Sequence, residues 1–189
     1  VPFSRLNRTQ TGAYLENGQL CFQGEAIMAV ADLKLPGQHN IENALAAIAA
    51  TKLAGVTNEA IIQVLTTFGG VRHRIQFVKE WQQRRIYNDS KATNIEAAKV
   101  AIASFDQPIT LIAGGLDRGF TFEELVPELQ QHVKNLVVYG ETADLMLEAG
   151  KLAHVKTLKK VSNLVEATEQ ALALSQAHEI ILLSPAAAS

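Results

Sequence analysis

The sequence is poor in several features that would assign it to common classes of protein. It has a single cysteine, Cys21, so its 189 residues cannot form an intrachain disulfide, and this is compatible with a reducing compartment. Aromatic residues make up only 6% of the chain, and no apolar run approaches the roughly 20 residues that a membrane-spanning helix needs. Residues 1–5 contain neither an initiator methionine nor the apolar core of a signal peptide. We therefore expect a cytoplasmic protein that does not enter a membrane.

Clustered positive charge is also missing. The formal net charge is −2, and no basic stretch resembles a nucleic-acid surface, so we expect no nucleic-acid partner. Hydrophobic residues make up 48% of the chain, which suffices for a core in one or two domains. The chain begins without methionine and stops directly after an apolar run at 180–183. These ends predict a fragment of a longer protein.

The second part of the chain alternates apolar runs with amphipathic helical patterns. Short, almost continuously apolar runs occupy 109–113, 136–140 and 180–183, and each is separated from the next by a helical periodicity. Strands that are apolar throughout are buried on both faces, as in parallel sheets covered by helices. We therefore predict an α/β fold with a doubly wound, mostly parallel, Rossmann-like sheet.

The first part has different patterning. Residues 14–22 predict a hairpin with an Asn17-Gly18 turn, and a further strand pattern covers 26–30. One helix is expected from Asn40 to the neighbourhood of Gly55, with Asn40 as a possible cap. A second helix is expected from Thr57, with four apolar residues turned inward: Ile61, Val64, Leu65 and Phe68. Because Gly69-Gly70 interrupts this pattern, we predict two domains, 1–72 and 73–189.

Several local signals refine the second domain. Thr93-x-x-Glu96 and Thr121-x-x-Glu124 are capping-box patterns, with these threonines as the predicted caps, and the first of the two helices is expected at about 94–105. In the polar stretch near 154–161, Lys156 to Lys160 are interpreted as a solvated face. The last helix is predicted to carry Val165, Thr168, Leu172 and Ser175 on one side.

The stretch 88–94, Asn-Asp-Ser-Lys-Ala-Thr-Asn, has the strongest chemical signal. It lies between a strand pattern and a helical pattern, where free N–H groups and the helix dipole favour an anion. Lys91 adds a cation, and the Asp89 carboxylate can accept hydrogen bonds from sugar hydroxyls. Ordinary turn and capping chemistry explains the same residues without a ligand. The stretch alone leaves both interpretations open.

Two other groups suggest a nucleotide. Asn40 and Asn43 are one helical turn apart, so both amides can offer a donor and an acceptor to a flat heterocycle such as adenine. His73 and Arg74 follow the Gly69-Gly70 break, where a guanidinium can bind phosphate and an imidazole can stack on a base. A capping asparagine and a solvated linker are the corresponding alternatives.

These residues follow the ends of predicted strands. Asp89 and Lys91 follow one strand, the loop 114–119 with Arg118 follows another, and 184–189 follows the last. Ligands of open parallel sheets bind beyond the carboxyl ends of the strands. A ligand site at this edge is therefore expected, although a tight turn and close packing also explain the glycines and alanines.

Five motifs, in this order, resemble those of the Mur ligase family: Leu-Pro-Gly-Gln-His-Asn at 35–40, His-Arg at 73–74, Asn-Asp-Ser-Lys-Ala-Thr-Asn at 88–94, Gly-Gly-Leu-Asp-Arg-Gly at 114–119 and Ser-Pro-Ala-Ala-Ala-Ser at 184–189. The resemblance covers nearly the whole chain. It is strongest to the members that use D-glutamate, because the motif at 88–94 lacks the tyrosine or histidine of the sister ligases.

The resemblance implies ATP-dependent formation of an amide bond between UDP-N-acetylmuramoyl-L-alanine and D-glutamate, through an acyl phosphate. It implies these ATP contacts: Asn40 and Asn43 with adenine, His73 beside the ring, Arg74 with phosphates and Asp89 with ribose. It implies these D-glutamate contacts: Lys91, Thr93, Arg118 and Ser189. Lys91 would also be catalytic, because it would lie between the reacting phosphate and D-glutamate.

Part of the family pattern is missing. No Gly-x-x-x-x-Gly-Lys-[Ser/Thr] occurs, so the phosphate-binding loop and the Mg²⁺ ligands are expected upstream of Val1. Residues 1–72 are then the tail of an ATP-binding domain, 73–189 most of an amino-acid-binding domain, and the fragment is inactive by itself. We expect the parent to be a monomer. Two alternatives stay open. One is a sister ligase that adds a different amino acid, or that adds glutamate to folate, and the other is a non-catalytic nucleotide-binding module.

Overall fold

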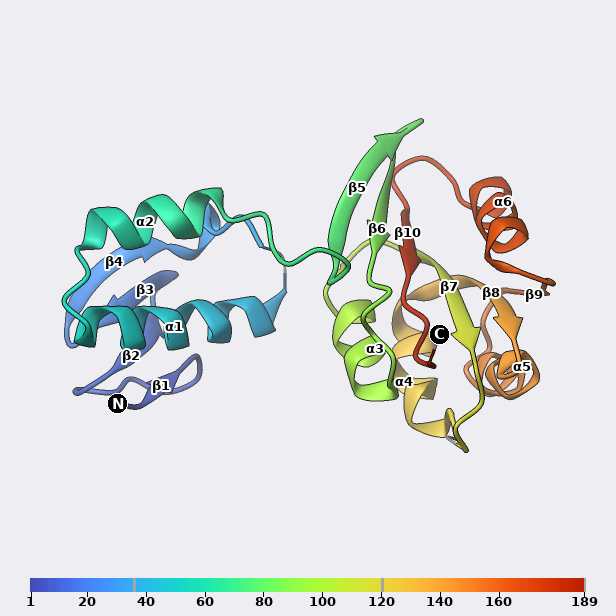
Figure 1. Cartoon of the computed structure of the whole chain (residues 1–189), viewed down its shortest axis with the longest axis horizontal. Coiled ribbons are helices and arrows are strands. Elements are labelled where there is room, and N and C mark those ends of the chain that lie inside the picture. Colours follow the sequence, from blue (N-terminus) through green and yellow to red (C-terminus); the bar gives the residue numbers. More distant parts are fainter. Residues whose placement is uncertain (36, 120, 189) are drawn as a thin grey trace. The chain divides into compact units, whose positions relative to one another are not determined.

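Residues 1–35, 37–119 and 121–188 are described by the structure, a computed structural model that divides into two units between Gly69 and Gly70 (Figure 1). We call Val1–Gly69 unit 1 and Gly70–Ser189 unit 2. No helix among the described residues is both long and apolar enough to cross a membrane.

Unit 1 contains a small sheet in the order β1-β2-β3-β4. Its strands are Phe3–Ser4, Ala13–Glu16, Gln19–Phe22 and Glu25–Ala29. The predicted hairpin is confirmed, since β2 and β3 pair antiparallel around Asn17 and Gly18. Both turn residues have positive φ, 50° and 75°, as a two-residue turn between twisted strands requires.

Two helices complete unit 1. After a short 3₁₀ segment at Val30–Asp32 come α1, Gln38–Leu53, and α2, Asn58–Thr67. The helices place their apolar residues against the sheet, which supplies Ala13, Leu20, Phe22, Ile27 and Met28 to the core. Thr57 caps α2 as predicted, because its side chain accepts a hydrogen bond from the Ala60 N–H.

Unit 2 is built on a six-stranded sheet in the order β5-β6-β10-β7-β8-β9. Its strands are Gln76–Trp81, Arg84–Asn88, Ile180–Leu183, Ile109–Gly115, Val133–Gly140 and Thr157–Lys160, in that order. All neighbours pair parallel except the β5–β6 hairpin. The predicted α/β fold with a mostly parallel sheet is confirmed.

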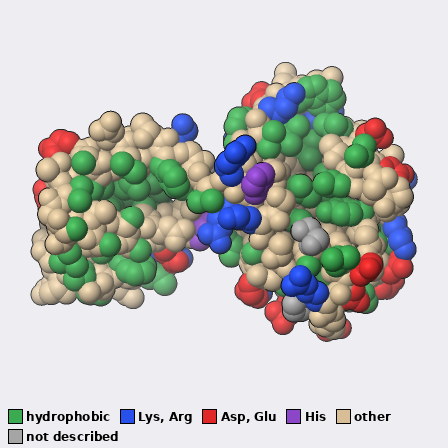
Figure 2. Space-filling view, in the orientation of Figure 1, with side chains coloured by type: hydrophobic (Ala, Val, Ile, Leu, Met, Phe, Trp, Pro, Cys, Tyr) green, Lys and Arg blue, Asp and Glu red, His purple; other side chains and the backbone are tan. Residues whose placement is uncertain are grey.

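Helices cover both faces of this sheet. A 3₁₀ turn, Glu123–Leu125, precedes α4, and the helices are α3 (Ile95–Ile102), α4 (Val126–His132), α5 (Ala143–Leu152) and α6 (Leu164–Leu174). Residues of α3, α4 and α5 share one buried cluster with Leu111 and Leu136 of the sheet. Helix α6 packs on the opposite face, against Ile112, Val137 and Ile181. The β5 edge is less covered, and Figure 2 shows apolar side chains on the surface over this hairpin.

The last strand determines which loops become neighbours. β10 lies between β6 and β7 and runs parallel to both, pairing Leu183 with Asn88 and with Ile112. The carboxyl ends of β6, β10 and β7 therefore meet at one edge of the sheet (Figure 1). Consequently, the segment after Leu183 lies between the turn after β6 and the loop after β7.

Three predicted helix caps were wrong. α1 begins at Gln38 after Gly37, whose φ of 94° suits a glycine, so Asn40 lies inside the helix and does not cap it. α3 is capped by Asn94, one residue after Thr93, and its side chain accepts from the Ala97 N–H at 2.9 Å. Thr121 caps nothing, because the 3₁₀ turn at Glu123–Leu125 has no side-chain cap and α4 starts only at Val126.

One strand in the second half was not predicted. The polar stretch at 154–161 contains β9, which pairs with β8 at the edge of the sheet, and Lys156, Lys159 and Lys160 are exposed there, as a solvated face requires. In α6 the buried residues are Ala167 and Ala171, and the partly buried Leu172 packs against the same cluster, whereas Val165 is 70% exposed. Two small residues one turn apart allow close packing of the helix on the sheet.

Candidate functional site

The unit 1 candidates lie on the first turns of α1. Asn40 is half-buried and Asn43 is exposed. The Asn43 Nδ2 donates to the Asn40 Oδ1 at 3.3 Å, so the two amides form one polar pair. Because the residues are three apart on a helix, local geometry alone places them on one face.

A mostly apolar slot of about 250 Å³ adjoins this pair. Its lining comes from α1, α2 and the segment before α1: Leu33, Leu35, Asn40, Asn43, Ala44, Ala47, Val64, Leu65 and Phe68. Val64 and Phe68 were predicted to point into the core, but they are 59% and 46% exposed. The sequence pattern identified them as apolar, and only the structure shows that they form the wall of a slot beside two amides.

In unit 2, the turn after β6 is organised around Asp89. This residue is 3% exposed, and its Oδ1 accepts from the Ile75 N–H at 3.0 Å. Its Oδ2 accepts from the Ser184 hydroxyl at 2.9 Å. Burial raises the pKa of Asp89, although both hydrogen bonds and the Arg74 charge act in the opposite direction. Both oxygens are thus engaged within the protein, and the predicted ribose contact stays a prediction.

His73 is hydrogen-bonded to the same turn. Its carbonyl accepts from the Lys91 N–H at 3.0 Å, and its Nδ1 lies 3.2 Å from the Asn88 Nδ2. Its φ of 66° is in the left-handed region, which is uncommon for residues other than glycine. The Arg74 side chain is exposed next to it. The structure therefore places the predicted phosphate-binding residues, His73 and Arg74, next to the turn that carries Lys91.

Lys91 and Thr93 are exposed on that turn. The backbone beneath them is fixed, because the Thr93 N–H donates to the Lys91 carbonyl at 2.9 Å and the Ala92 N–H to the Asp89 carbonyl at 2.9 Å. A rigid turn with an exposed ammonium and an exposed hydroxyl, next to the start of α3, is suited to holding an anion.

The loop after β7 carries Arg118, which is exposed. Asp117 organises the loop, since its Oδ1 accepts from the Gly119 N–H at 2.7 Å. Two residues that sequence reasoning missed support it from the next strand end. Glu141 accepts from the Asp117 N–H at 3.0 Å, and Thr142 accepts from the Gly115 N–H at 3.0 Å.

The remaining candidate, Ser189, lies outside the described residues. The segment before it is buried, with Ser184, Ala186 and Ala187 at most 1% exposed. Ser184 was not singled out from the sequence. Its signal was a serine directly after an apolar strand, a position where a hydroxyl must find a buried partner.

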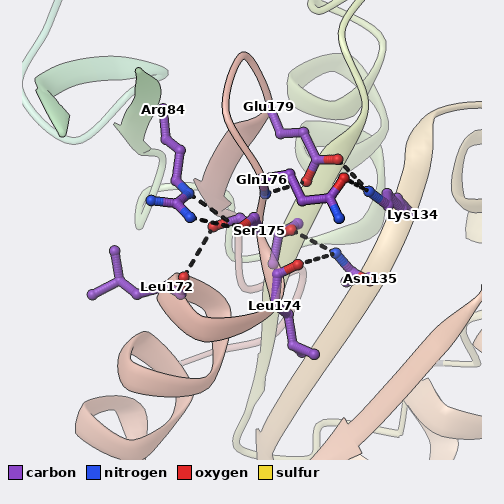
Figure 3. A network of polar contacts seen from close by, with 9 residues as sticks. Arg84, Lys134, Asn135, Leu172, Leu174, Ser175, Gln176 and Glu179 are labelled. Atoms are coloured by element: carbon purple, nitrogen blue, oxygen red, sulfur yellow. Dashed lines mark hydrogen bonds and ion pairs between the residues drawn. The ribbon is translucent and has the colours of Figure 1, made fainter. Parts of the chain in front are cut away.

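The opposite, amino-terminal edge of the sheet carries a polar network of another kind (Figure 3). Arg84 donates from Nε and Nη2 to the Ser175 carbonyl at the end of α6, and the buried Glu179 pairs with Lys134. Asn135 donates to the Thr110 hydroxyl at 2.9 Å. These groups satisfy one another, so they explain the anchoring of α6 and not a ligand site. Within the described ranges, no group of three or more metal-binding side chains occurs.

A mostly parallel sheet with helices on both faces and polar loops after three adjacent strands defines a doubly wound α/β domain. Residues 73–187 match the family described as Mur ligase, glutamate ligase domain. The chain belongs to this family.

Individual relatives are similar along the whole chain. The UDP-N-acetylmuramoylalanine–D-glutamate ligase of Latilactobacillus sakei subsp. sakei (strain 23K) is 61% identical over all 189 residues, and that of Limosilactobacillus fermentum is 57% identical. The chain spans 42% and 41% of the length of these two relatives.

Solved structures share the fold at low identity. The UDP-N-acetylmuramate-alanine ligase of Thermotoga maritima has a TM-score of 0.69 and 19% identity, over 90% of this chain and 39% of its own. The folylpolyglutamate synthase of Mycobacterium tuberculosis, complexed with ADP, has a TM-score of 0.66 and 16% identity, over 92% of this chain and 44% of its own.

Proposed function

We propose that this chain is part of an ATP-dependent ligase that joins D-glutamate to UDP-N-acetylmuramoyl-L-alanine in the synthesis of peptidoglycan precursors. The observation that carries the proposal is the 61% identity, over all 189 residues, to a relative bearing that name. The parent would be a longer, monomeric, cytoplasmic enzyme, and this chain alone would be inactive.

The adenine subsite is assigned to Asn40 and Asn43 with the adjoining slot. A volume of about 250 Å³ suits one aromatic base and is too small for a whole nucleotide. Apolar walls match the faces of a purine, and the amide pair can match the donors and acceptors of its edge. His73 would lie beside the ring, Arg74 would bind the phosphates and Asp89 would neighbour the ribose.

The reaction itself is assigned to the edge formed by β6, β10 and β7. In the proposed reaction, ATP phosphorylates the substrate carboxylate, the amine of D-glutamate attacks this acyl phosphate, and phosphate leaves. Lys91 would stabilise negative charge as the amine attacks, since an ammonium held on a rigid turn needs little reorganisation. Thr93, Arg118 and Ser189 would hold the two carboxylates of D-glutamate, which favour cations and hydroxyls.

Mg²⁺ would neutralise the phosphates of ATP. As the family resemblance implies, its ligands are assigned to the upstream part of the parent. The role of residues 1–72 as the tail of an ATP-binding domain, and of 73–189 as the amino-acid-binding domain, belongs to the same proposal.

Ligation by the full-length parent tests the function. Phosphate release should require ATP, UDP-N-acetylmuramoyl-L-alanine and D-glutamate together, with a product one glutamate heavier by mass spectrometry. L-lysine, diaminopimelate and a folate with L-glutamate serve as competing substrates. Preference for any of these over D-glutamate would assign the chain to a sister ligase.

Calorimetric titration of the 189-residue chain separates the ligase from a self-contained nucleotide-binding module. The ligase proposal predicts very weak binding of ATP, because the phosphate-binding loop would lie in another part of the protein. Tight binding of ATP would favour the non-catalytic module.

A further inference from the structure

Three segments that are distant in sequence meet at the carboxylate of Asp89. Its two oxygens accept from the Ile75 N–H at 3.0 Å and from the Ser184 hydroxyl at 2.9 Å, and its own N–H donates to the Leu183 carbonyl at 2.7 Å. Ser184 is fully buried and Asp89 nearly so. A buried hydrogen bond to a carboxylate is among the stronger ones in proteins, and losing one partner leaves the other unsatisfied.

The backbone on both sides of this contact is in unusual conformations. Ile75 has a φ of 42°, which is an outlier for a β-branched residue, and Ala186 has a φ of 55°. Such conformations persist only where surrounding contacts hold them. Here the contacts are the Ile75 N–H to Asp89 bond and the bond from the Ala186 N–H to the Ala92 carbonyl, 2.9 Å long.

The segment 184–188 is hydrogen-bonded to the loops on either side of it. On the side of the Lys91 turn, the Ala186 N–H donates to the Ala92 carbonyl. Toward the Arg118 loop, the Gly114 N–H donates to the Pro185 carbonyl at 2.9 Å, and the Leu116 N–H to the Ala188 carbonyl at 2.8 Å. All these bonds are between backbone groups. The Ser184–Asp89 contact adds a side-chain bond that fixes where this segment leaves β10.

We infer that Ser184 is a positioning residue of the ligase: its hydroxyl holds the segment 184–188 against the Lys91 turn, and so sets the geometry of the D-glutamate subsite. The inference rests on the proposed function. Ser184 has no exposed surface, so its role would be to position other groups and not to bind the substrate itself. It acts on Lys91 through Asp89, which precedes Lys91 on the same turn. It also acts through the segment 184–188, which precedes the predicted ligand Ser189 in the sequence.

Ser184→Ala in the full-length parent tests this role. The variant should raise KM for D-glutamate about tenfold, because small displacements of positioning groups have large kinetic effects. KM for UDP-N-acetylmuramoyl-L-alanine should change much less, because in the proposed reaction only the reacting carboxylate of that substrate comes to this edge. A loss of stability alone would lower the active fraction and leave both KM values unchanged.

Thr110→Val is the matched control. It removes another fully buried hydroxyl, the acceptor of the 2.9 Å bond from Asn135, at the opposite edge of the same sheet. This variant should lower the melting temperature as Ser184→Ala does, with KM for D-glutamate as in the wild type. If both variants raise KM for D-glutamate equally, the effect is general loosening and the inference is overturned.

Ser184→Cys supports the test if the alanine variant does not fold, because a thiol is close in size and donates only weakly. An intermediate KM for D-glutamate is expected from it. If folded Ser184→Ala or Ser184→Cys enzyme keeps the wild-type KM, Ser184 has no positioning role. A wild-type parent that does not ligate D-glutamate would instead refute the proposed function, so the two failures are distinguishable.

Discussion

Unit 1 and unit 2 bring their candidate residues together over very different lengths of chain. Asn40 and Asn43 in unit 1 are three residues apart and contact each other within one helix. In unit 2, Asp89 and Ser184 are 95 residues apart, and their contact requires β10 to insert between β6 and β7. The first arrangement needs only a helix, whereas the second needs the completed sheet. Substitutions should therefore affect the units differently.

The largest effect is expected from Lys91→Ala in the full-length parent. Turnover should fall by a factor of about a hundred or more, because a preorganised charge at a developing anion contributes on this scale. The matched control is Lys99→Ala, since Lys99 lies on α3 and pairs with the exposed Glu96 at 3.2 Å. Steady-state kinetics measures both. Wild-type turnover in Lys91→Ala would remove this lysine from the mechanism.

Gly115→Ala should disrupt the contact in unit 2 between the loop after β7 and the segment 184–188. An added Cβ would lie 2.1 Å from the Ala188 carbonyl oxygen, which the neighbouring Leu116 N–H already holds. We expect a loss of about 3 kcal/mol in the free energy of unfolding, as in overpacked cores. Urea unfolding of the 189-residue chain measures the change.

Gly69→Ala is the control for this substitution. No atom outside the immediate chain neighbours lies within 4 Å of a Cβ added there, so stability should be nearly unchanged. Equal stability of the two variants would show that the approach of Gly115 to Ala188 is not as close as described.

Thr57→Ala tests the local character of unit 1. Loss of the cap from the Thr57 side chain to the Ala60 N–H should destabilise α2 by about 1 kcal/mol. Because the contact is confined to one helix terminus, hydrogen exchange should accelerate in unit 1 and stay unchanged in unit 2. Asn163→Ala removes the corresponding cap of α6 and should give the reverse pattern.

The smallest effect expected is a pH dependence that comes from Asp89. Burial raises the pKa of this carboxyl above its ordinary value of 3.8, so the folded state binds the proton more tightly than the unfolded chain. The stability from this group is present below the ordinary pKa and is lost as the pH rises through the raised value. Asp89→Asn should flatten this decline in urea unfolding from acidic to neutral pH. An unchanged slope would mean that Asp89 titrates as it does in the unfolded chain.

Much of the fold was predictable because its signals are local. The Asn17-Gly18 turn, the Thr57 cap and the apolar runs of β7, β8 and β10 each depend on residues a few positions apart. Errors arose where two local signals competed, as at Thr93 and Asn94, or where an edge strand carried lysines, as in β9. The Asn40 cap failed because Gly37 offered an earlier entry to the helix.

The sequence by itself determined the class of fold, the family and the residue types at the strand ends, since hydrophobic periodicity and short motifs carry this information. Tertiary structure decided that Val64 and Phe68 line a slot, and that the Ser184 hydroxyl contacts the Asp89 carboxylate. It also placed the segment 184–188 between two loops. These features depend on strand order, and strand order follows from packing free energy summed over the whole sheet, which no local pattern specifies.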